Sequence, residues 1–471
     1  MVKKIKKRAV ITLPAKASVF YTLTGAFERG INVLFTPIFT RLLTPGEYGV
    51  YPLYTSWLGI LTVFLSLELS GSIIYRALTK YRAKQYELIM NSYIILSFLS
   101  ALAFLIVGIF PELFENILSL PRKYIYFLIL QIFINGVINL YISLCKYSYR
   151  YKLPALINLL NAFISPALAF LFIYSFNIRN GARIISPLII GIIIALPLFI
   201  YVLRSADAMP SADIIKYLLS LSLPLLPHFL SLTVMSQSGK IFIGKFYGEE
   251  AVAKYSLVFS VGFLFTLFTT GIQSSLLPWI NRKLSHGAGN TVDLLCERLF
   301  KLFSLISLLS ITFMREGLLI LAPREYSDAL VAVYPISISV LLSFLSTILY
   351  TVIVYYGRSY YVTLSSIASA IISIGLHLLI TRRLSYLGAA LTQAIGSLIL
   401  VILYAIILGG VLKKNSFKPI NYVKIILFAI AISTLIFIFR TSIFSRILLF
   451  IAIFLMAIPQ SIDLYRLVRE K

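Results

Sequence analysis

Apolar stretches of about 20 residues recur along the whole chain, and short polar segments separate them. A helix of that length crosses the hydrocarbon core of a bilayer, so each stretch predicts a transmembrane helix. We place fourteen such helices near residues 17–40, 48–70, 88–110, 124–145, 153–176, 184–203, 217–244, 254–280, 299–322, 329–356, 361–380, 386–410, 420–439 and 443–465. The pattern therefore predicts an all-α polytopic membrane protein with about 14 transmembrane helices.

The first predicted helix differs from the others because its polar residues share one side. At 100° per residue, one arc collects Ser18, Tyr21, Thr22, Thr24, Gly25, Glu28, Arg29, Asn32, Thr36 and Thr40. A charge at mid-membrane costs about 2.5–3.5 kcal/mol on insertion scales, so Glu28 and Arg29 require an explanation. Either this face lines a hydrated cavity, or the two charges form structural ion pairs with other helices.

Other polar positions within the spans give weaker signals. Lys240 and Gln273, in the seventh and eighth helices, could extend a polar lining. Arg315 lies about two turns from one end of the ninth helix, where its side chain could equally reach the membrane surface. Pro224 and Pro227 predict a kink in the seventh helix. The segment 291–303 is either an amphipathic helix on the membrane surface or the start of the ninth span.

Composition narrows the class of protein further. Hydrophobic residues make up 59% of the 471 residues and charged residues 13%, whereas soluble domains carry about 25% charged residues. A water-soluble globule is thereby excluded. Two cysteines, Cys145 and Cys296, stand apart from any CxxC pair, which excludes a disulfide framework and a cysteine-rich zinc site.

The net charge of +25 reflects topology more than nucleic-acid binding. Most Lys and Arg residues flank apolar stretches, and no loop is large enough for a basic nucleic-acid module. The segments on the side of the N-terminus carry more than twice as many Lys and Arg residues as those on the opposite side. The positive-inside rule then predicts a multi-pass protein of the cell membrane with both termini in the cytoplasm.

Five motifs occur in an order typical of one family. They are ThrArgLeuLeuThrProGlyGluTyrGlyValTyr (40–51), ProLeuLeuProHisPheLeuSerLeu (224–232), LysIlePheIleGlyLysPheTyrGly (240–248), TyrSerAspAlaLeu (326–330) and TyrLeuGlyAlaAlaLeuThrGln (386–393). In sequence and spacing they resemble the O-antigen and capsule-type polysaccharide flippases of the multidrug/oligosaccharidyl-lipid/polysaccharide exporter superfamily. Two positions depart from that resemblance: Gly239, where many relatives are acidic, and His377, where many have Asn.

The resemblance implies two six-helix lobes around a central cavity, followed by two C-terminal helices. The implied parts are a basic cytoplasmic N-terminus (1–16), an N-lobe with helices 1–6 (17–203) and a cytoplasmic linker (204–216). They are followed by a C-lobe with helices 7–12 (217–410) and by helices 13–14 with the cytoplasmic C-terminus (411–471). It also implies a monomer that works by alternating access and is not an enzyme. Such a protein exports a polyprenyl-diphosphate-linked oligosaccharide from the cytoplasmic to the outer leaflet.

The polar positions fit such a substrate. Arg29, Lys240 and Arg315 could attract the diphosphate, since guanidinium groups bind phosphates through paired hydrogen bonds. Tyr21, Thr24, Asn32 and Gln273 suit hydrogen bonds to sugars. Glu28 could oppose Arg29 or couple transport to H⁺ or Na⁺. No cofactor, metal or nucleic acid is expected; the expected partners are the lipid-linked oligosaccharide, membrane lipids and other polysaccharide-assembly proteins.

Two other functions compete with this interpretation. A cation-coupled small-molecule or drug antiporter of the same superfamily would favour an acidic cavity. Here the predicted spans contain three basic residues, Arg29, Lys240 and Arg315, as well as three acidic ones, Glu28, Glu68 and Glu316. An integral membrane glycosyltransferase or polymerase would need catalytic acids or bases on a sizeable outer loop. Every predicted outer loop is short, which makes an enzyme the weaker alternative.

Overall fold

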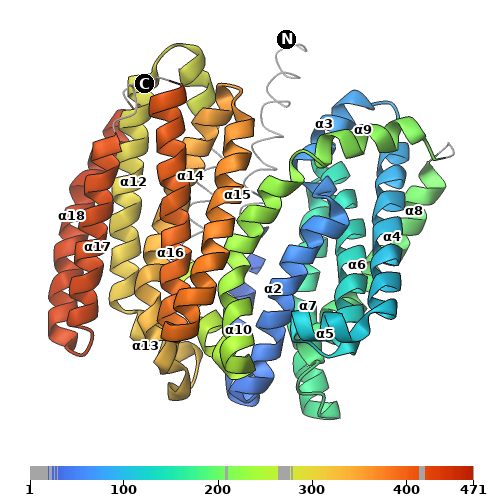
Figure 1. Cartoon of the computed structure of the whole chain (residues 1–471), viewed down its shortest axis with the longest axis horizontal. Helices are drawn as coiled ribbons and strands as arrows, with labels where there is room; N and C mark the ends of the chain where they lie inside the picture. Colours follow the sequence, from blue (N-terminus) through green and yellow to red (C-terminus); the bar gives the residue numbers. More distant parts are fainter. Residues whose placement is uncertain are drawn as a thin grey trace, which may run out of the picture. The chain divides into compact units, whose positions relative to one another are not determined.

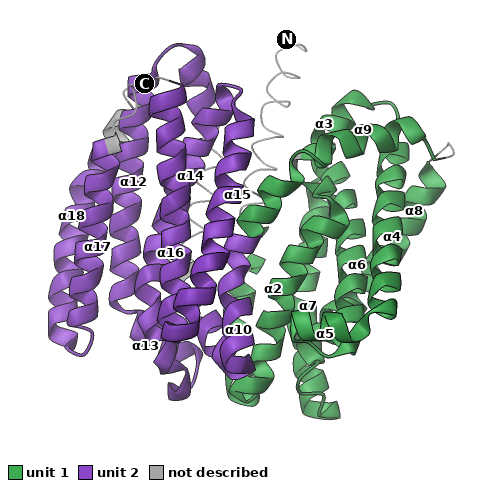
Figure 2. Ribbon diagram, viewed as in Figure 1, with its two compact units in different colours: residues 1–233 green, residues 234–471 purple. Residues whose placement is uncertain are grey.

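The computed structural model describes residues 20, 24–25, 27–28, 30–206, 210–263, 276, 279–412 and 419–469. These residues form helices joined by short turns, and the described part contains no strand (Figure 1). Contacts within the chain divide it into two units, residues 1–233 and 234–471 (Figure 2). The protein is thus all-α, as the apolar stretches predict.

Unit 1 is built around one central helix, α6. Its helices are α2 (Pro45–Ser66), the π-helical turn η1 (Leu69–Ile73), α3 (Ile74–Lys80), α4 (Gln85–Ile109), α5 (Pro111–Leu118), α6 (Arg122–Tyr147), α7 (Lys152–Phe176), α8 (Ala182–Ser205) and α9 (Ala212–Ser222). Helix α6 packs against α2, α4 and α8. A Cβ at Gly136 would lie 2.5 Å from Leu96 of α4, so glycine allows this close approach between helices.

Unit 2 is built around two helices, α12 and α14. Its elements are α10 (Leu226–Phe263), which begins in unit 1, α12 (Gly289–Thr312), α13 (Met314–Leu321), η2 (Arg324–Ala332), α14 (Val333–Tyr355), α15 (Ser359–Leu376), η3 (His377–Thr381), α16 (Arg382–Ile406), η4 (Ile407–Val411), α17 (Pro419–Ile438) and α18 (Ile443–Arg469). Helix α14 packs on α16, and α12 packs on α14, α17 and α18. The core of the unit lies between these packed helices.

The predicted spans and the described helices agree in position, but their number is not settled by the structure. Nine described helices are long and apolar enough to cross a membrane, or eleven if each bent pair counts as one span. The stretch Ser359–Val411 counts once among the nine, although non-helical backbone at Ser385 divides it into two predicted spans. The spans predicted at 17–40 and 254–280 fall partly outside the described residues. The number fourteen therefore stays a prediction.

Two local features of the predicted helices can be checked directly. Helix α9 ends at Ser222 and α10 begins at Leu226, so the helix is interrupted where Pro224 and Pro227 predict a kink. The segment 291–303 belongs to the continuous helix α12. Its apolar side packs inward, with Phe300 buried 5.9 Å from the ring of Tyr422 in α17. It is therefore the start of the ninth span, and a separate surface helix is excluded.

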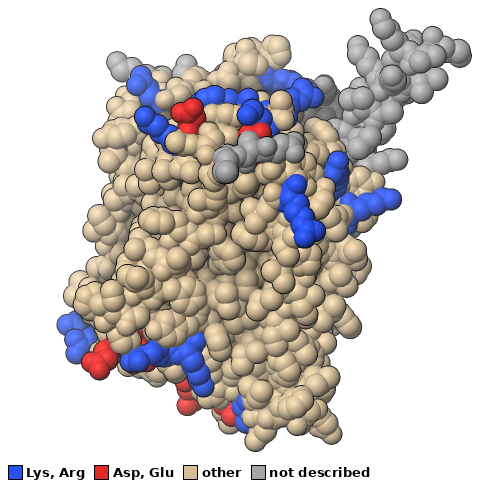
Figure 3. Space-filling view, turned by 90° about the vertical axis from the view of Figure 1, so that its right-hand side faces the viewer, with Lys and Arg blue, Asp and Glu red and all other residues tan. Residues whose placement is uncertain are grey.

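The surface has the pattern of a protein embedded in lipid. Large apolar side chains are exposed along the helices of unit 1, among them Phe98, Phe163, Ile193 and Leu196. On the face shown in Figure 3, Lys and Arg side chains gather toward the two ends of the helices, with a broad uncharged band between them. Apolar exposure of this extent suits hydrocarbon and would be unfavourable in water. The chain is a multi-pass membrane protein.

Candidate functional site

The start of helix α2 is fixed by residues of the motif at 40–51. Thr44 and Glu47 form a capping box, in which the Glu47 amide donates to Thr44 Oγ1 at 3.3 Å and the Thr44 amide donates to Glu47 Oε2 at 2.8 Å. Pro45 occupies the first helical turn, where its missing N–H costs nothing. The helix therefore begins at one defined residue.

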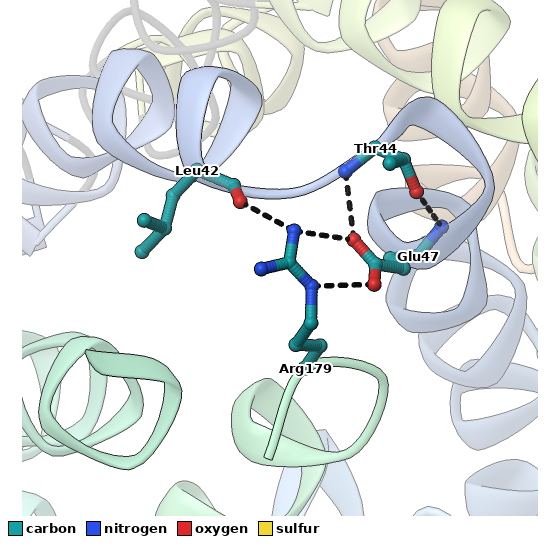
Figure 4. Close-up of polar contacts among 4 residues, drawn as sticks. All are labelled: Leu42, Thr44, Glu47 and Arg179. Atoms are coloured by element: carbon teal, nitrogen blue, oxygen red, sulfur yellow. Dashed lines mark hydrogen bonds and ion pairs between the residues drawn. The ribbon is translucent and has the colours of Figure 1, made fainter. Parts of the chain in front are cut away.

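The same carboxylate holds a second loop in place. Arg179, in the turn between α7 and α8, donates from Nε to Glu47 Oε1 at 2.6 Å and from Nη2 to Oε2 at 3.0 Å. Its Nη2 also donates to the carbonyl of Leu42 at 2.8 Å (Figure 4). Donating these hydrogen bonds to the Glu47 carboxylate raises the pKa of the Arg179 guanidinium. We call Thr44, Glu47 and Arg179 the corner, because they tie the start of α2 to the start of α8.

Removing the corner carboxylate should loosen both helix starts. We expect Glu47→Ala to lower the free energy of unfolding by about 2 kcal/mol, since it removes the capping box and a two-point charged hydrogen bond that is partly exposed. Thermal unfolding of the purified protein in detergent measures this loss. Glu112→Ala is the matched control, because Glu112 is an exposed first-turn acid of α5. An equal loss of unfolding free energy in the two variants would show that the corner does not stabilise the protein.

One turn beyond Arg179, α8 places a second arginine among aromatic rings. The Cζ atom of Arg183 lies 4.1 Å from the ring centroid of Tyr51, 4.6 Å from that of Tyr48 and 4.9 Å from that of Phe39. Phe39 and Tyr48 are buried. Rings at such distances attract a guanidinium through their negative faces. The corner thus brings three rings from before and within α2 around one cation of α8.

Arg183 lines a polar cavity inside unit 1, which we call the unit-1 cavity. Its volume is about 210 Å³, enough for several water molecules or a small polar group. The side chains lining it come from the first predicted span and from α2, α6, α7 and α8, and the polar ones include Glu28, Asn32, Gln131, Asn135, Asn161 and Arg183. Tyr54 Oη donates to Gln131 Oε1 at 2.7 Å and so fixes one amide of the wall.

Prolines add to the polarity of this cavity. Pro166 of α7 and Pro187 of α8 both line it. A proline inside a helix leaves the carbonyl four residues earlier without its helical donor, here at Ala162 and Arg183. Such interruptions are tolerated in membrane helices where they border a polar cavity.

The structure brings two of the residues predicted from the first span to this cavity. Glu28 and Asn32 line it, and Asn32 Nδ2 donates to the Glu28 carbonyl at 3.0 Å. Glu28 also interacts electrostatically with Lys146. Thr24 is buried, and its hydroxyl donates to the carbonyl of Phe20 one turn earlier.

The remaining predicted residues either fall outside the described part of the chain or belong to unit 2. Tyr21, Arg29 and Gln273 are outside the described residues. Lys240 belongs to unit 2, where its Nζ lies 4.8 Å from the ring centroid of Phe259. Arg315 is exposed and lines a cavity of about 380 Å³ in unit 2, together with Arg440 and Arg446. The described candidates therefore fall into separate places in the two units.

The sequence interpretation did not include the polar residues of α6, α7 and α8. Gln131 and Asn135 are one helical turn apart on α6, as are Asn161 and Ser165 on α7. That spacing is a polar stripe on an apolar helix, the signal that identified the first span. With Asn139 on α6 and Asn158 on α7, each stripe has three members, too few to distinguish it from scattered polar residues. Arg183 gave no signal because it stands at the end of a predicted span.

The fold is that of known membrane transporters. The structure of the lipid II flippase MurJ in an inward closed conformation matches with a TM-score of 0.68 and 15% identity, covering 96% of this chain and 100% of that chain. An inward-facing multidrug resistance MATE family transporter of the MOP superfamily matches with a TM-score of 0.67 and 14% identity, over 82% and 96% of the two chains. At these identities the matches show the fold alone.

A third structure of this fold is a MOP superfamily transporter from Pyrococcus furiosus, for which reverse polarity of the binding pocket suggests a different function. Its TM-score is 0.58 with 14% identity, over 85% of this chain and 97% of that chain.

Residues 15–283 match the model of a family described as polysaccharide biosynthesis protein, and the chain belongs to this family. None of the curated proteins compared with it matches the chain.

Proposed function

We propose that the protein is a flippase that moves a polyprenyl-diphosphate-linked oligosaccharide from the cytoplasmic to the outer leaflet of the cell membrane by alternating access. The transported sugar would serve surface polysaccharide assembly, as in O-antigen or capsule. Membership of the polysaccharide biosynthesis family supports this proposal, as does the fold shared with a lipid II flippase. Both termini then lie in the cytoplasm, and the protein acts as a monomer that is not an enzyme.

The unit-1 cavity is the observation that carries the proposal. Sugar hydroxyls and a diphosphate are strongly hydrated and cannot cross hydrocarbon unaided, whereas a polyprenyl tail can remain in the lipid. A cavity within membrane-spanning helices, lined by Asn and Gln amides and one arginine, offers the head group donors and acceptors in place of water.

The residues predicted from the sequence keep their roles as part of the proposal. Arg29, Lys240 and Arg315 would attract the diphosphate, and Tyr21, Thr24, Asn32 and Gln273 would bond sugars. Thr24 suits this role less, because its hydroxyl already donates within its own helix. Glu28 would couple transport to H⁺ or Na⁺. It is the one carboxylate among the described side chains that line the unit-1 cavity.

A cavity amide provides the test. We expect Asn135→Leu to slow transport of a lipid-linked oligosaccharide roughly 10-fold, because the leucine leaves sugar hydroxyls without a partner. The assay reconstitutes the full-length protein in vesicles of phosphatidylethanolamine and phosphatidylglycerol with a fluorescently labelled polyprenyl-diphosphate trisaccharide. A membrane-impermeant quencher reports the fraction of head groups on the outer side over time.

Asn139→Leu is the matched control, since Asn139 lies one turn further along α6, is exposed and is not among the residues of the unit-1 cavity. It should transport at the wild-type rate. The shared fold with a multidrug resistance transporter makes drug export the competing function. Wild-type vesicles that move cationic dyes but no lipid-linked sugar would overturn the proposal in favour of that function.

A further inference from the structure

Arg183 forms no ion pair with any described carboxylate, although Glu28 lines the same unit-1 cavity. Arg179, one turn earlier, is paired with Glu47, and the other described ion pairs involve different cations. A charge held between packed helices is costly unless it has a partner or a function. Arg183 has three aromatic rings around it and no described carboxylate within ion-pair distance.

The rings do not satisfy the hydrogen-bonding groups of Arg183. Cation–π contacts act on the faces of the guanidinium, whereas its N–H donors point outward in its plane. Nη1 is buried and has no hydrogen-bond partner among the described residues. The rings thus hold the group in one orientation and leave a buried charged donor without a hydrogen-bond partner among the described residues.

Two further buried polar atoms without a partner belong to the same unit-1 cavity. They are Oδ1 of Asn161 in α7 and Oγ of Ser186, three residues after Arg183 in α8. A serine hydroxyl donates or accepts, and an asparagine offers both functions. A cationic donor with two such neighbours complements an oxyanion that carries adjacent hydroxyls.

We propose that Arg183, Asn161 and Ser186 form an oxyanion-binding site in the unit-1 cavity that takes an acidic group of the transported head. The group is either a sugar carboxylate or the diphosphate, since both accept paired hydrogen bonds from a guanidinium. This inference rests on the proposed flippase function. The corner and the aromatic rings preorganise the site, so little ordering is required when the anion binds.

Binding tests the site separately from transport. Wild-type protein and Arg183→Gln, both in detergent, are titrated with inorganic pyrophosphate, glucuronate and glucose by calorimetry. We expect at least one of the two anions to bind the variant 10-fold or more weakly than wild type, with no difference for glucose. Equal affinities of the two proteins for both anions would overturn the proposal.

Transport then identifies the source of the anion. Vesicles receive two polyprenyl-diphosphate trisaccharides that differ only in whether one sugar is a uronic acid. A loss confined to the acidic substrate in Arg183→Gln assigns the site to the sugar carboxylate, and an equal loss with both substrates assigns it to the diphosphate. Unchanged transport of both would overturn the proposal.

Controls separate recognition from folding. Arg82→Gln removes an exposed charge from the turn between α3 and α4, away from the corner and the unit-1 cavity, and should leave the ratio of acidic to neutral transport at the wild-type value. If Arg183→Gln does not fold, Ser186→Ala serves instead and should weaken anion binding about 3-fold or more without a change of charge. Failure of wild type to move either lipid, with the difference in anion binding intact, would contradict the flippase function and leave the site standing.

Discussion

Replacing Gly388 by alanine is expected to lower the free energy of unfolding by about 3 kcal/mol, the upper part of the usual range for overpacking. A Cβ at this position would lie 2.5 Å from the carbonyl oxygen of Ile380 and 2.8 Å from Cα of Thr381. These are backbone atoms, which cannot rotate away as a flexible side chain could. The first turns of α16 would have to move away from η3.

Thermal unfolding in detergent would measure this effect against two other glycine variants. Gly375→Ala in α15 and Gly409→Ala in η4 place their Cβ atoms where no heavy atom lies within 4 Å. Both controls should be as stable as wild type or slightly more so, since alanine favours helices. A Gly388→Ala protein as stable as these controls would show that α16 and η3 are not closely packed.

Gly388 also gives a physical reason for one family motif. The stretch from Tyr386 to Gln393 follows Ser385, whose backbone lies at φ 50° and ψ −124°. That break lets the chain pass from η3 into α16 with the two in contact. Only a residue without a Cβ fits at the contact between η3 and α16, so close packing explains the glycine in this motif.

The apolar pattern predicted the fold well because each membrane helix is specified locally. The span predicted at 88–110 is α4, Gln85–Ile109, and the span predicted at 124–145 is α6, Arg122–Tyr147. The break at Gly248 of α10 lies in the loop predicted between the spans 217–244 and 254–280. The bend of 58° between α12 and α13 was missed, because it lies inside the predicted span 299–322 and neither proline nor glycine stands at Phe313. Likewise, the start of α12 was placed too late because its polar turn packs against α17.

The candidate site was predicted only where one helix carries enough of it. Glu28 and Asn32 were predicted because nine polar residues and one glycine share one face of the first span. The corner joins Glu47 to Arg179, which are 132 residues apart, and no periodicity connects them. Arg183 shows its role only once Phe39, Tyr48 and Tyr51 surround it. Sites made of single residues from several helices depend on packing that local patterns do not encode.

The largest expected effect of a charge change is at Glu316 in unit 2. Arg446 of α18 is only 4% exposed and donates to Glu316 from Nη1 at 2.7 Å and from Nη2 at 2.6 Å. Its Nη1 also donates to the Thr312 carbonyl at 3.1 Å. Glu316→Gln should lower the free energy of unfolding by about 3 kcal/mol, because it leaves a buried cation without its counter-charge.

A double variant separates the worth of this pair from the cost of breaking it. Glu316→Gln combined with Arg446→Met should unfold at a higher temperature than Glu316→Gln alone, because methionine removes the unpaired buried charge. Additive losses in the two single variants would contradict this account. The pair also bears on the cavity lined by Arg315, Arg440 and Arg446, since Glu316 neutralises Arg446 within the protein. The positive charge that this cavity can present to a ligand therefore comes from Arg315 and Arg440, while Asp328, which also lines it, pairs with Lys254.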